Sequence, residues 1–231
     1  MRFFCLHGRG TNSKIFELQT DQPEKLREEL HDHEFVFIDG AIPTEPSGGA
    51  TAVADQFYGY ISDPVNTSQC RDLVAGLVDY VQSEGPFDAV MGFSEGGVIA
   101  AMLLIEDSRH PFAGFKCGIF FSSALPLDPD VARTDSLRCI DPEADGVVIR
   151  VPITVVVEEN LIRLRNLSPL ANLWRQEDAQ EALVQICDED LREVVRLDIG
   201  HQVPGSRSRD GLLETVQAIE RTIERAVDRF S

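Results

Sequence analysis

A serine between two glycines is the residue of this 231-residue chain whose surroundings most clearly indicate chemistry. Residues 92–96 read Gly-Phe-Ser-Glu-Gly, after a short apolar run at 89–91 and before an apolar stretch at 98–104 that has the character of a buried helix. A strand, a Gly-x-Ser-x-Gly turn and a helix form the context of a nucleophile elbow, because small residues let the strand and the helix pass closely. The pattern predicts Ser94 as a nucleophile, against the simpler alternative of a glycine-rich turn without chemistry.

A histidine late in the chain supplies the base that a serine nucleophile needs. Of the five histidines, only His201 lies well downstream of Ser94, in the loop 200–205 that follows an apolar run at 194–199. Loops after strands commonly display catalytic side chains. Taken alone, His201 is better explained as a surface residue. Together with Ser94, it is predicted to be the general base.

A glycine-rich loop near the start of the chain is suited to binding an oxyanion. The apolar run 3–6 leads into His-Gly-Arg-Gly at 7–10. Acyl transfer needs two backbone N–H donors for its oxyanion, and we expect them from the peptides of Arg9 and Glu95. The alternative, a phosphate-binding loop, lacks the third glycine and the Lys–hydroxyl pair. We expect His7 to hold the loop by hydrogen bonds, and the Glu95 carboxylate to face solvent or cap the following helix.

Short apolar runs alternate with helical patterns, which is typical of a mainly parallel central sheet with helices on both faces. Six strands are predicted, at 2–6, 34–38, 88–92, 117–122, 152–157 and 193–199. Helices are predicted at 14–30 with a break near Pro23, at 71–84, 169–180 and 188–192, and at 211–230. Two stretches near 40–67 and 125–146 follow strands without this alternation. They are predicted to be lid-like loops over the active-site edge.

The composition limits the possible partners of the chain. Its 231 residues, 43% of them hydrophobic, suit one α/β domain over residues 1–231. The net charge of −18 argues against nucleic acid or an anionic membrane as a partner. Five widely spaced cysteines show no C-x-x-C metal or redox spacing. We expect no metal and no cofactor. Neither a signal-peptide pattern nor a membrane-length apolar run is present, and we expect a soluble, cytoplasmic protein.

Four motifs, taken in their order along the chain, resemble the fungal serine hydrolase family. They are Leu-His-Gly-x-Gly at 6–10, the run 35–40 leading to Pro43 and Pro46, Gly-Phe-Ser-Glu-Gly-Gly at 92–97, and Gly-His-x-x-Pro at 200–204. The resemblance extends from about residue 2 to 230 and implies a compact α/β-hydrolase fold. It also implies that Ser94 is the nucleophile, that His201 is the base, and that segment 43–67 borders the substrate cleft. Many such proteins are free-standing thioesterases of polyketide pathways, which implies an acyl substrate and, as a partner, the acyl carrier protein of a polyketide synthase.

The chain departs from the family pattern at the acid that should orient the histidine. The usual family pattern after the strand that corresponds to 152–157 is Gly-x-x-Asp, whereas residues 158–161 read Glu-Glu-Asn-Leu, with Leu161 at the aspartate position. We select Glu159 as the acid, with Glu158 as the alternative, because either carboxylate can stabilise the imidazolium. Asn160 would fix the tautomer without supplying charge. The more distant candidates are Asp188, Asp190 and Asp198.

The sequence therefore predicts a serine hydrolase that acts on acyl thioesters or esters and releases or trims a polyketide acyl chain held on a carrier protein. Two alternatives stay open. One is a non-hydrolytic binder or cyclisation catalyst on the same fold, which the missing aspartate motivates. The other is a general carboxylesterase for small esters.

Overall fold

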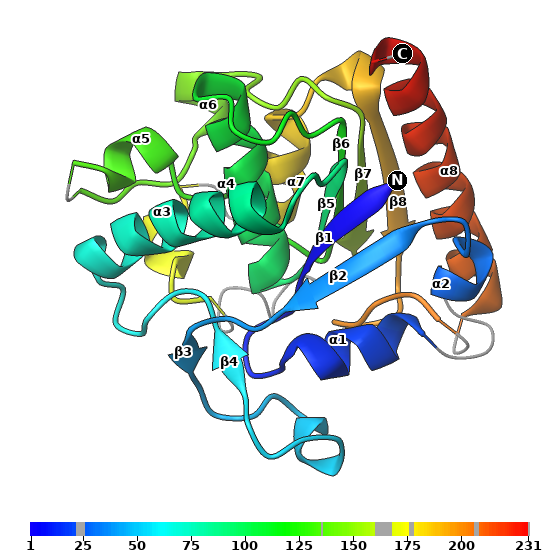
Figure 1. Ribbon diagram of the computed structural model, residues 1–231, viewed down its shortest axis with the longest axis horizontal. Coiled ribbons are helices and arrows are strands. Elements are labelled where there is room, and N and C mark those ends of the chain that lie inside the picture. The colour runs from blue at the N-terminus through cyan, green and yellow to red at the C-terminus, as the bar shows by residue number, and fades with distance from the viewer. Residues whose placement is uncertain (22–25, 135, 160–167, 176–177, 206–207, 231) are drawn as a thin grey trace.

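A parallel sheet forms the centre of the molecule (Figure 1). The computed structural model describes residues 1–21, 26–134, 136–159, 168–175, 178–205 and 208–230. Within these residues, six strands pair in parallel in the order β2-β1-β5-β6-β7-β8. Their bounds are β1 Arg2–Leu6, β2 Glu34–Ile38, β5 Ala89–Phe93, β6 Cys117–Phe121, β7 Ile153–Glu158 and β8 Arg192–Leu197. All six predicted strands are confirmed, because each lies close to its expected range.

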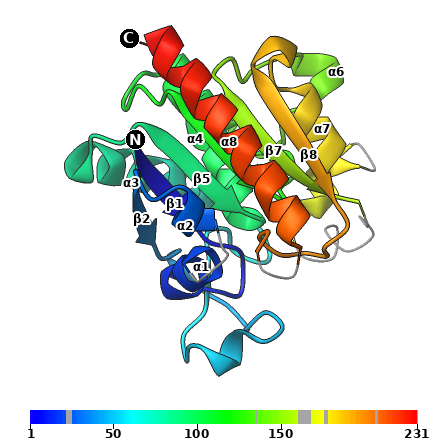
Figure 2. The same ribbon diagram turned by 90° about the vertical axis from the view of Figure 1, so that its right-hand side faces the viewer.

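The alternation of side chains along the strands builds a hydrophobic core on each face of the sheet. In β1, for example, Phe3 and Cys5 face one core, whereas Phe4 and Leu6 face the other. Figure 2 shows α8 running across the first face, with α1 and α2 on the same side. The helices of this face are α1 Ser13–Thr20, α2 Leu26–Glu29 and α8 Arg209–Phe230. The helices of the opposite face are α3 Thr67–Glu84, α4 Glu95–Arg109 and α7 Ala179–Gln185.

The helix predictions are confirmed for the long amphipathic segments and wrong for two short segments. The predicted helix at 14–30 is split into α1 and α2, and Pro23 lies outside the described residues. Within the range 169–180 the described residues form a 3₁₀ turn, Ala171–Leu173, followed by Trp174, whose backbone is extended. Only Ala179 and Gln180, the first two residues of α7, are α-helical there, and residues 176–177 lie outside the described residues. The Trp174 side chain is buried and its ring N–H donates to the carbonyl of Leu125, so tertiary packing overrides the helical pattern. The segment predicted as a helix at 188–192 is a 3₁₀ turn, Glu189–Leu191.

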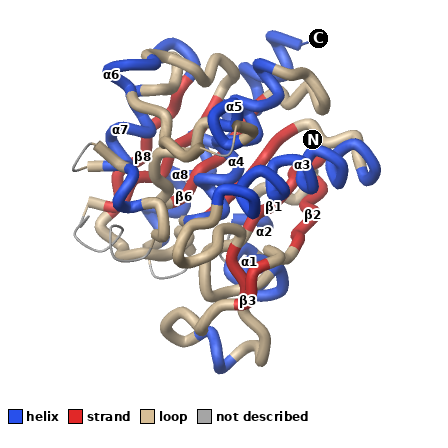
Figure 3. The backbone as a smooth tube through the Cα atoms, turned by 90° about the vertical axis from the view of Figure 1, so that its left-hand side faces the viewer, coloured by secondary structure: helices blue, strands red, loops and turns tan. Residues whose placement is uncertain are grey.

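The two segments predicted as lid-like loops leave the carboxyl ends of β2 and β6, at the sheet edge where Ser94 follows β5. The first contains an antiparallel hairpin, β3 Ile42–Pro43 with β4 Tyr58–Gly59, and a 3₁₀ turn, Ala50–Ala52. This hairpin segment projects away from the sheet (Figure 3). The second contains two short helices, α5 Pro129–Ala132 and α6 Pro142–Asp145. Both loops thus start beside the predicted nucleophile.

Helix α8 shows how the amphipathic pattern of the sequence is used. Its buried side chains include Leu212, Val216 and Ile219, which share one face at helical spacing and belong to the core that it covers. Charged side chains lie outside this stripe. One of them, Arg221, donates to Glu193 of β8 at 2.9 Å. Among the described helices, none is both long enough and apolar enough to cross a membrane.

The five cysteines, all of which lie in the described residues, are buried and free. Burial disfavours a thiolate, and it raises the pKa of Cys187 and of Cys117 to about 12. These thiols are core residues.

Two Gly→Ala substitutions are expected to change stability in opposite directions, because one glycine lies at the close crossing of β1 and α4 and the other lies in open space on α3. A Cβ at Gly96 would lie 2.1 Å from the carbonyl oxygen of Leu6, whereas a Cβ at Gly76 in α3 would meet nothing within 4 Å. We expect Gly96→Ala to lower the free energy of unfolding by about 3 kcal/mol, because backbone must move to make room. Gly76→Ala should raise it by roughly 0.5–1 kcal/mol through the better helix propensity of alanine. Urea denaturation measures both changes, and a Gly96→Ala protein as stable as wild type would contradict the crossing.

Candidate active site

Ser94 occupies a strained position between a strand and a helix. Strand β5 ends at Phe93 and α4 begins at Glu95, so Ser94 alone makes the turn. Its φ of 55° and ψ of −118° lie in a region that non-glycine residues rarely adopt. The Ser94 N–H donates to the carbonyl of Phe121 at 2.9 Å, which fixes the turn against β6. The backbone therefore has the geometry of a nucleophile elbow.

The structure brings the predicted base to the predicted nucleophile. His201 Nε2 lies 2.9 Å from Ser94 Oγ, across 107 positions of sequence. His201 follows β8 in a turn where Gly200 has a φ of 73°, a conformation that favours glycine. The imidazole packs on Phe93, with the two ring centroids 4.9 Å apart. The ring is therefore held beside the elbow by both a hydrogen bond and an aromatic contact.

The carboxylate beside His201 belongs to Glu158, not to Glu159. Glu158 Oε2 lies 3.3 Å from His201 Nδ1, and the Glu158 side chain is 4% exposed. Glu159 is exposed, and its N–H donates to the carbonyl of Leu197 at 3.1 Å. Successive side chains of a strand point to opposite faces, and Glu158 is the last residue of β7. The selection of Glu159 from the sequence is corrected for this reason: it lies one residue beyond the position that faces the histidine.

The other acid candidates lie elsewhere. Asp188 and Asp190 precede β8, at the amino end of the strand and so at the sheet edge opposite Ser94. Asp198 is exposed just after β8. Asn160 and Leu161 lie outside the described residues.

The hydrogen bonds of His201 suit a general base. Burial disfavours the imidazolium and lowers the pKa of His201 to about 4, so the ring is neutral near pH 7. With its proton on Nδ1, the ring donates to Glu158 and presents the lone pair of Nε2 to the Ser94 hydroxyl. This is the protonation pattern required to take a proton from serine.

The loop at 7–11 is held against the elbow by a buried hydrogen-bond network. The Gly40 N–H donates to His7 Nε2 at 2.9 Å, and His7 Nδ1–H donates to the Gly8 carbonyl at 2.8 Å. Thr11 Oγ1 also donates to the Gly8 carbonyl. A Cβ at Gly8 would come within 3.4 Å of Ser94 Cβ, so the loop touches the nucleophile. As expected from the sequence, His7 holds this loop by hydrogen bonds.

The Glu95 carboxylate is buried, which corrects the expectation that it faces solvent or caps α4. Its Oε1 pairs with Arg9 Nη1 at 3.1 Å, and its Oε2 accepts the Tyr60 N–H at 2.9 Å. Sequence reasoning considered only the peptide groups of Arg9 and Glu95. The signal that could have found the ion pair was the opposite charge of these two positions, both already expected beside the nucleophile.

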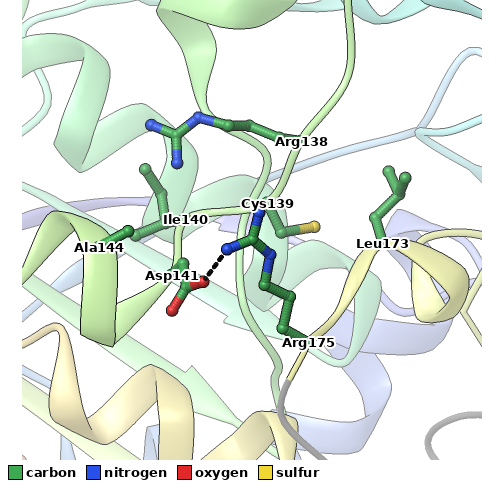
Figure 4. A pocket seen from close by; sticks show the side chains of 7 residues that line it. All are labelled: Arg138, Cys139, Ile140, Asp141, Ala144, Leu173 and Arg175. Atoms are coloured by element: carbon green, nitrogen blue, oxygen red, sulfur yellow. Dashed lines mark hydrogen bonds and ion pairs between the residues drawn. The ribbon is translucent and has the colours of Figure 1, made fainter.

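Neither of the two cavities that we describe is lined by Ser94 or His201. The first, of about 70 Å³, lies between α6 and the residues Leu173 and Arg175, and Arg175 pairs there with Asp141 at 3.0 Å (Figure 4). It is smaller than sites for organic ligands, which start near roughly 300 Å³. The second, an open groove of about 760 Å³, runs between α3 and the loop after β2. The acyl pocket is therefore not defined by either cavity.

A parallel sheet with a strained serine after a central strand, a neutral histidine bonded to that serine and a buried carboxylate behind it define a serine hydrolase with the α/β-hydrolase fold. The chain belongs to the family described as serine hydrolase (FSH1), which it matches over residues 1–211. The membership agrees with the resemblance drawn from the motifs.

Relatives from fungi support this assignment. The chain is 28% identical to esterase FPY3 of Fusarium mangiferae, over 99% of this chain and 98% of the relative. It is 36% identical to hydrolase FUB4 of Fusarium oxysporum f. sp. lycopersici, over 54% of this chain and 48% of the relative. Among solved structures, a carboxylesterase from Mesorhizobium loti superposes with a TM-score of 0.55 at 12% identity, covering 95% of this chain and 88% of that one. That last likeness concerns the fold.

The buried environment of His201 predicts that activity is retained to an unusually low pH. A protonated imidazole cannot accept the serine proton, and burial means that more acid is needed to protonate it. We expect kcat/KM for a nitrophenyl ester to stay level from about pH 8 to about pH 5.5 and to be halved near pH 4. Circular dichroism at each pH separates this loss from unfolding. Half-loss near pH 6.5 would mean that the histidine is solvated like a free imidazole.

Proposed function

We propose that the protein hydrolyses acyl esters or thioesters through an acyl-enzyme on Ser94, with His201 as the base and Glu158 as the acid of the triad. The observation that carries the proposal is the 2.9 Å contact between Ser94 Oγ and His201 Nε2, with the Glu158 carboxylate on the other ring nitrogen. A serine in a strained turn with a neutral, oriented imidazole is an activated nucleophile.

The reaction proceeds in two halves. In the first, the Ser94 hydroxyl proton passes to His201 Nε2 while Oγ bonds to the acyl carbon. The tetrahedral intermediate then expels the alcohol or thiol, which leaves with the proton from His201. In the second half, water gives a proton to His201 as it attacks the acyl-enzyme. Ser94 recovers that proton when the carboxylic acid departs.

The oxyanion is held by the peptide N–H groups of Arg9 and Glu95. Two features support these donors. Arg9 lies in the loop that touches the elbow, and Glu95 opens α4, where the helix dipole favours negative charge. No hydrogen bond within the described residues involves either peptide N–H, which leaves both available to a substrate oxygen.

The family supports a proposal for the substrate class. We propose that the protein acts in fungal secondary metabolism and releases or trims a polyketide acyl chain carried as a thioester by an acyl carrier protein. The family resemblance favours this partner, and the hairpin segment 40–66 starts at the active-site edge, where it can border the acyl chain. With a net charge of −18, contact with an acidic carrier must be local and weak.

A small-ester carboxylesterase is the second candidate, and the esterase names of several relatives favour it. The two functions differ in the leaving group and not in the catalytic residues. A comparison of kcat/KM for a nitrophenyl butyrate and for an acyl pantetheine thioester separates them. The non-hydrolytic alternative was motivated by the missing aspartate, and the carboxylate of Glu158 beside His201 removes that motive.

Covalent catalysis predicts a single reactive serine. A fluorophosphonate probe should add its mass to the protein at Ser94, and Ser94→Ala should abolish the adduct and lower ester hydrolysis by at least about 10³-fold. Ser83→Ala, a surface change near the end of α3, serves as the control and should label normally. An unlabelled wild-type protein, under conditions that label another serine hydrolase, would remove the covalent mechanism.

The two adjacent glutamates predict a sharp contrast. Glu158→Gln keeps the size of the side chain but removes the charge behind His201, and we expect kcat to fall by roughly 10²–10⁴-fold. Glu159→Gln changes an exposed side chain and should leave kcat within about twofold. Steady-state kinetics on both purified variants decide the matter. Equal losses, or a larger loss in Glu159→Gln, would return the acid to Glu159.

A further inference from the structure

An ion pair between a buried carboxylate and a partly buried guanidinium joins the two residues whose peptide groups are proposed to hold the oxyanion. The Arg9 guanidinium lies 3.1 Å from Glu95 Oε1, and the Glu95 side chain is 2% exposed. Arg9 belongs to the loop after β1, and Glu95 is the first residue of α4. The Arg9–Glu95 contact therefore links the loop after β1 to the start of α4, two segments that belong to different elements.

The hairpin segment closes over the pair and completes its hydrogen bonds. The Tyr60 N–H donates to Glu95 Oε2 at 2.9 Å, and Arg9 Nη1 donates to the Ile61 carbonyl at 2.6 Å. A Cβ at Gly59 would lie 2.7 Å from Glu95 Oε2 and 3.1 Å from Arg9 Nη1, so only glycine lets this backbone approach so closely. Three segments thus meet at one charge pair.

The geometry points to Arg9 and Glu95 as positioning residues: through their side-chain ion pair, they fix the relative placement of the two oxyanion donors. The inference rests on the proposed function, since it concerns the same site. Oxyanion donors act by being held in place before the charge develops, and small displacements of such groups are costly. The ion pair restrains the distance between the two donor residues directly, because it joins their own side chains.

Burial makes the pair a unit whose members depend on each other. Burial raises the pKa of Glu95, while the Tyr60 N–H and the Arg9 charge oppose that rise. Loss of Arg9 would leave the buried Glu95 charge without its ion-pair partner, which is more disruptive than loss of both charges. The pair is also nearly neutral as a whole, so the negative carboxylate does not repel the developing oxyanion.

The variants Glu95→Gln, Arg9→Met and the double variant test the inference. A glutamine at 95 can still accept the Tyr60 N–H, so this variant removes the charge with little change of shape. Glu106→Gln is the matched control: Glu106 lies on the same helix, its side chain is equally buried at 2% exposed, and it pairs with Arg133. It is 11 residues from Glu95, or about 16 Å along the helix axis.

We expect both single variants to lower kcat for a nitrophenyl ester at least about tenfold, with KM changed by less than about threefold. Inhibition by a trifluoromethyl ketone, which forms an oxyanion on Ser94, should weaken in parallel. The acid limb of the pH profile should not move, because His201 is untouched. The double variant should be no worse than the more damaged single variant, and Glu106→Gln should keep wild-type kcat.

A second measurement stands apart from activity. Amide hydrogen exchange in a peptide covering residues 7–12 should quicken by about tenfold in Glu95→Gln relative to wild type, with no such local change in Glu106→Gln. Wild-type kcat in folded Glu95→Gln and Arg9→Met, or a rise of kcat in Glu95→Gln, would overturn the inference. A rise would mean that the negative charge of Glu95 destabilises the oxyanion, and that this effect outweighs any positioning of the two N–H donors by the ion pair. If wild type is not labelled at Ser94, the proposed function fails by itself, and unchanged exchange in residues 7–12 separately refutes the restraint.

Discussion

The crossing of helix α4 over the ends of β1 and β5 is the contact that every part of the site requires. At this crossing, backbone touches backbone: a Cβ at Gly92 would lie 2.3 Å from the Gly96 carbonyl oxygen, and one at Gly96 would meet β1. The crossing leaves room for one residue between strand and helix, and that residue, Ser94, takes a φ of 55°. The strain costs stability, of the order of 1–3 kcal/mol, and the parallel sheet on both sides of β5 holds it in place. What the protein gains is a hydroxyl whose direction is set by the main chain.

The residues around Ser94 are supported from two different sides of the crossing. Phe93 belongs to the core beneath α8, and the His201 ring packs against the Phe93 ring. The histidine is therefore supported from the α8 face of the sheet. The loop at 7–11 and Glu95 instead connect to the hairpin segment after β2. In the proposed mechanism, Ser94 therefore stands between a proton-transfer side with His201 and a proposed oxyanion side with Arg9 and Glu95, each supported by separate parts of the chain. Changes in the hairpin can alter the oxyanion side without displacing the histidine.

Much of this arrangement is readable from the sequence because it depends on local patterns. The six strands are apolar runs bounded by turns, and Ser94 and His201 follow strands that the pattern identifies. What could not be read depends on orientation. Whether Glu158 or Glu159 faces the histidine is decided by the residue at which β7 ends, and a shift of one residue reverses the side. The burial of Glu95 depends on an arginine 86 positions away. Trp174 leaves its predicted helix because of a partner 49 positions away. Long-range contacts of this kind have no local signature.

The position of Glu158 also bears on how catalysis is divided within the site. In the family pattern, the acid is an aspartate three residues further on, in the loop, whereas here a glutamate reaches the histidine from the last position of the strand. The longer side chain brings Oε2 to 3.3 Å from Nδ1, which is longer than the roughly 2.7–2.9 Å of a strong charged hydrogen bond. Burial dominates the pKa of His201, which is lowered and not raised. An imidazole held in this way is well oriented but gains less help in becoming charged. In the proposed mechanism, a larger share of transition-state stabilisation then falls to the proposed oxyanion donors, on the side of the site where the Arg9–Glu95 ion pair lies.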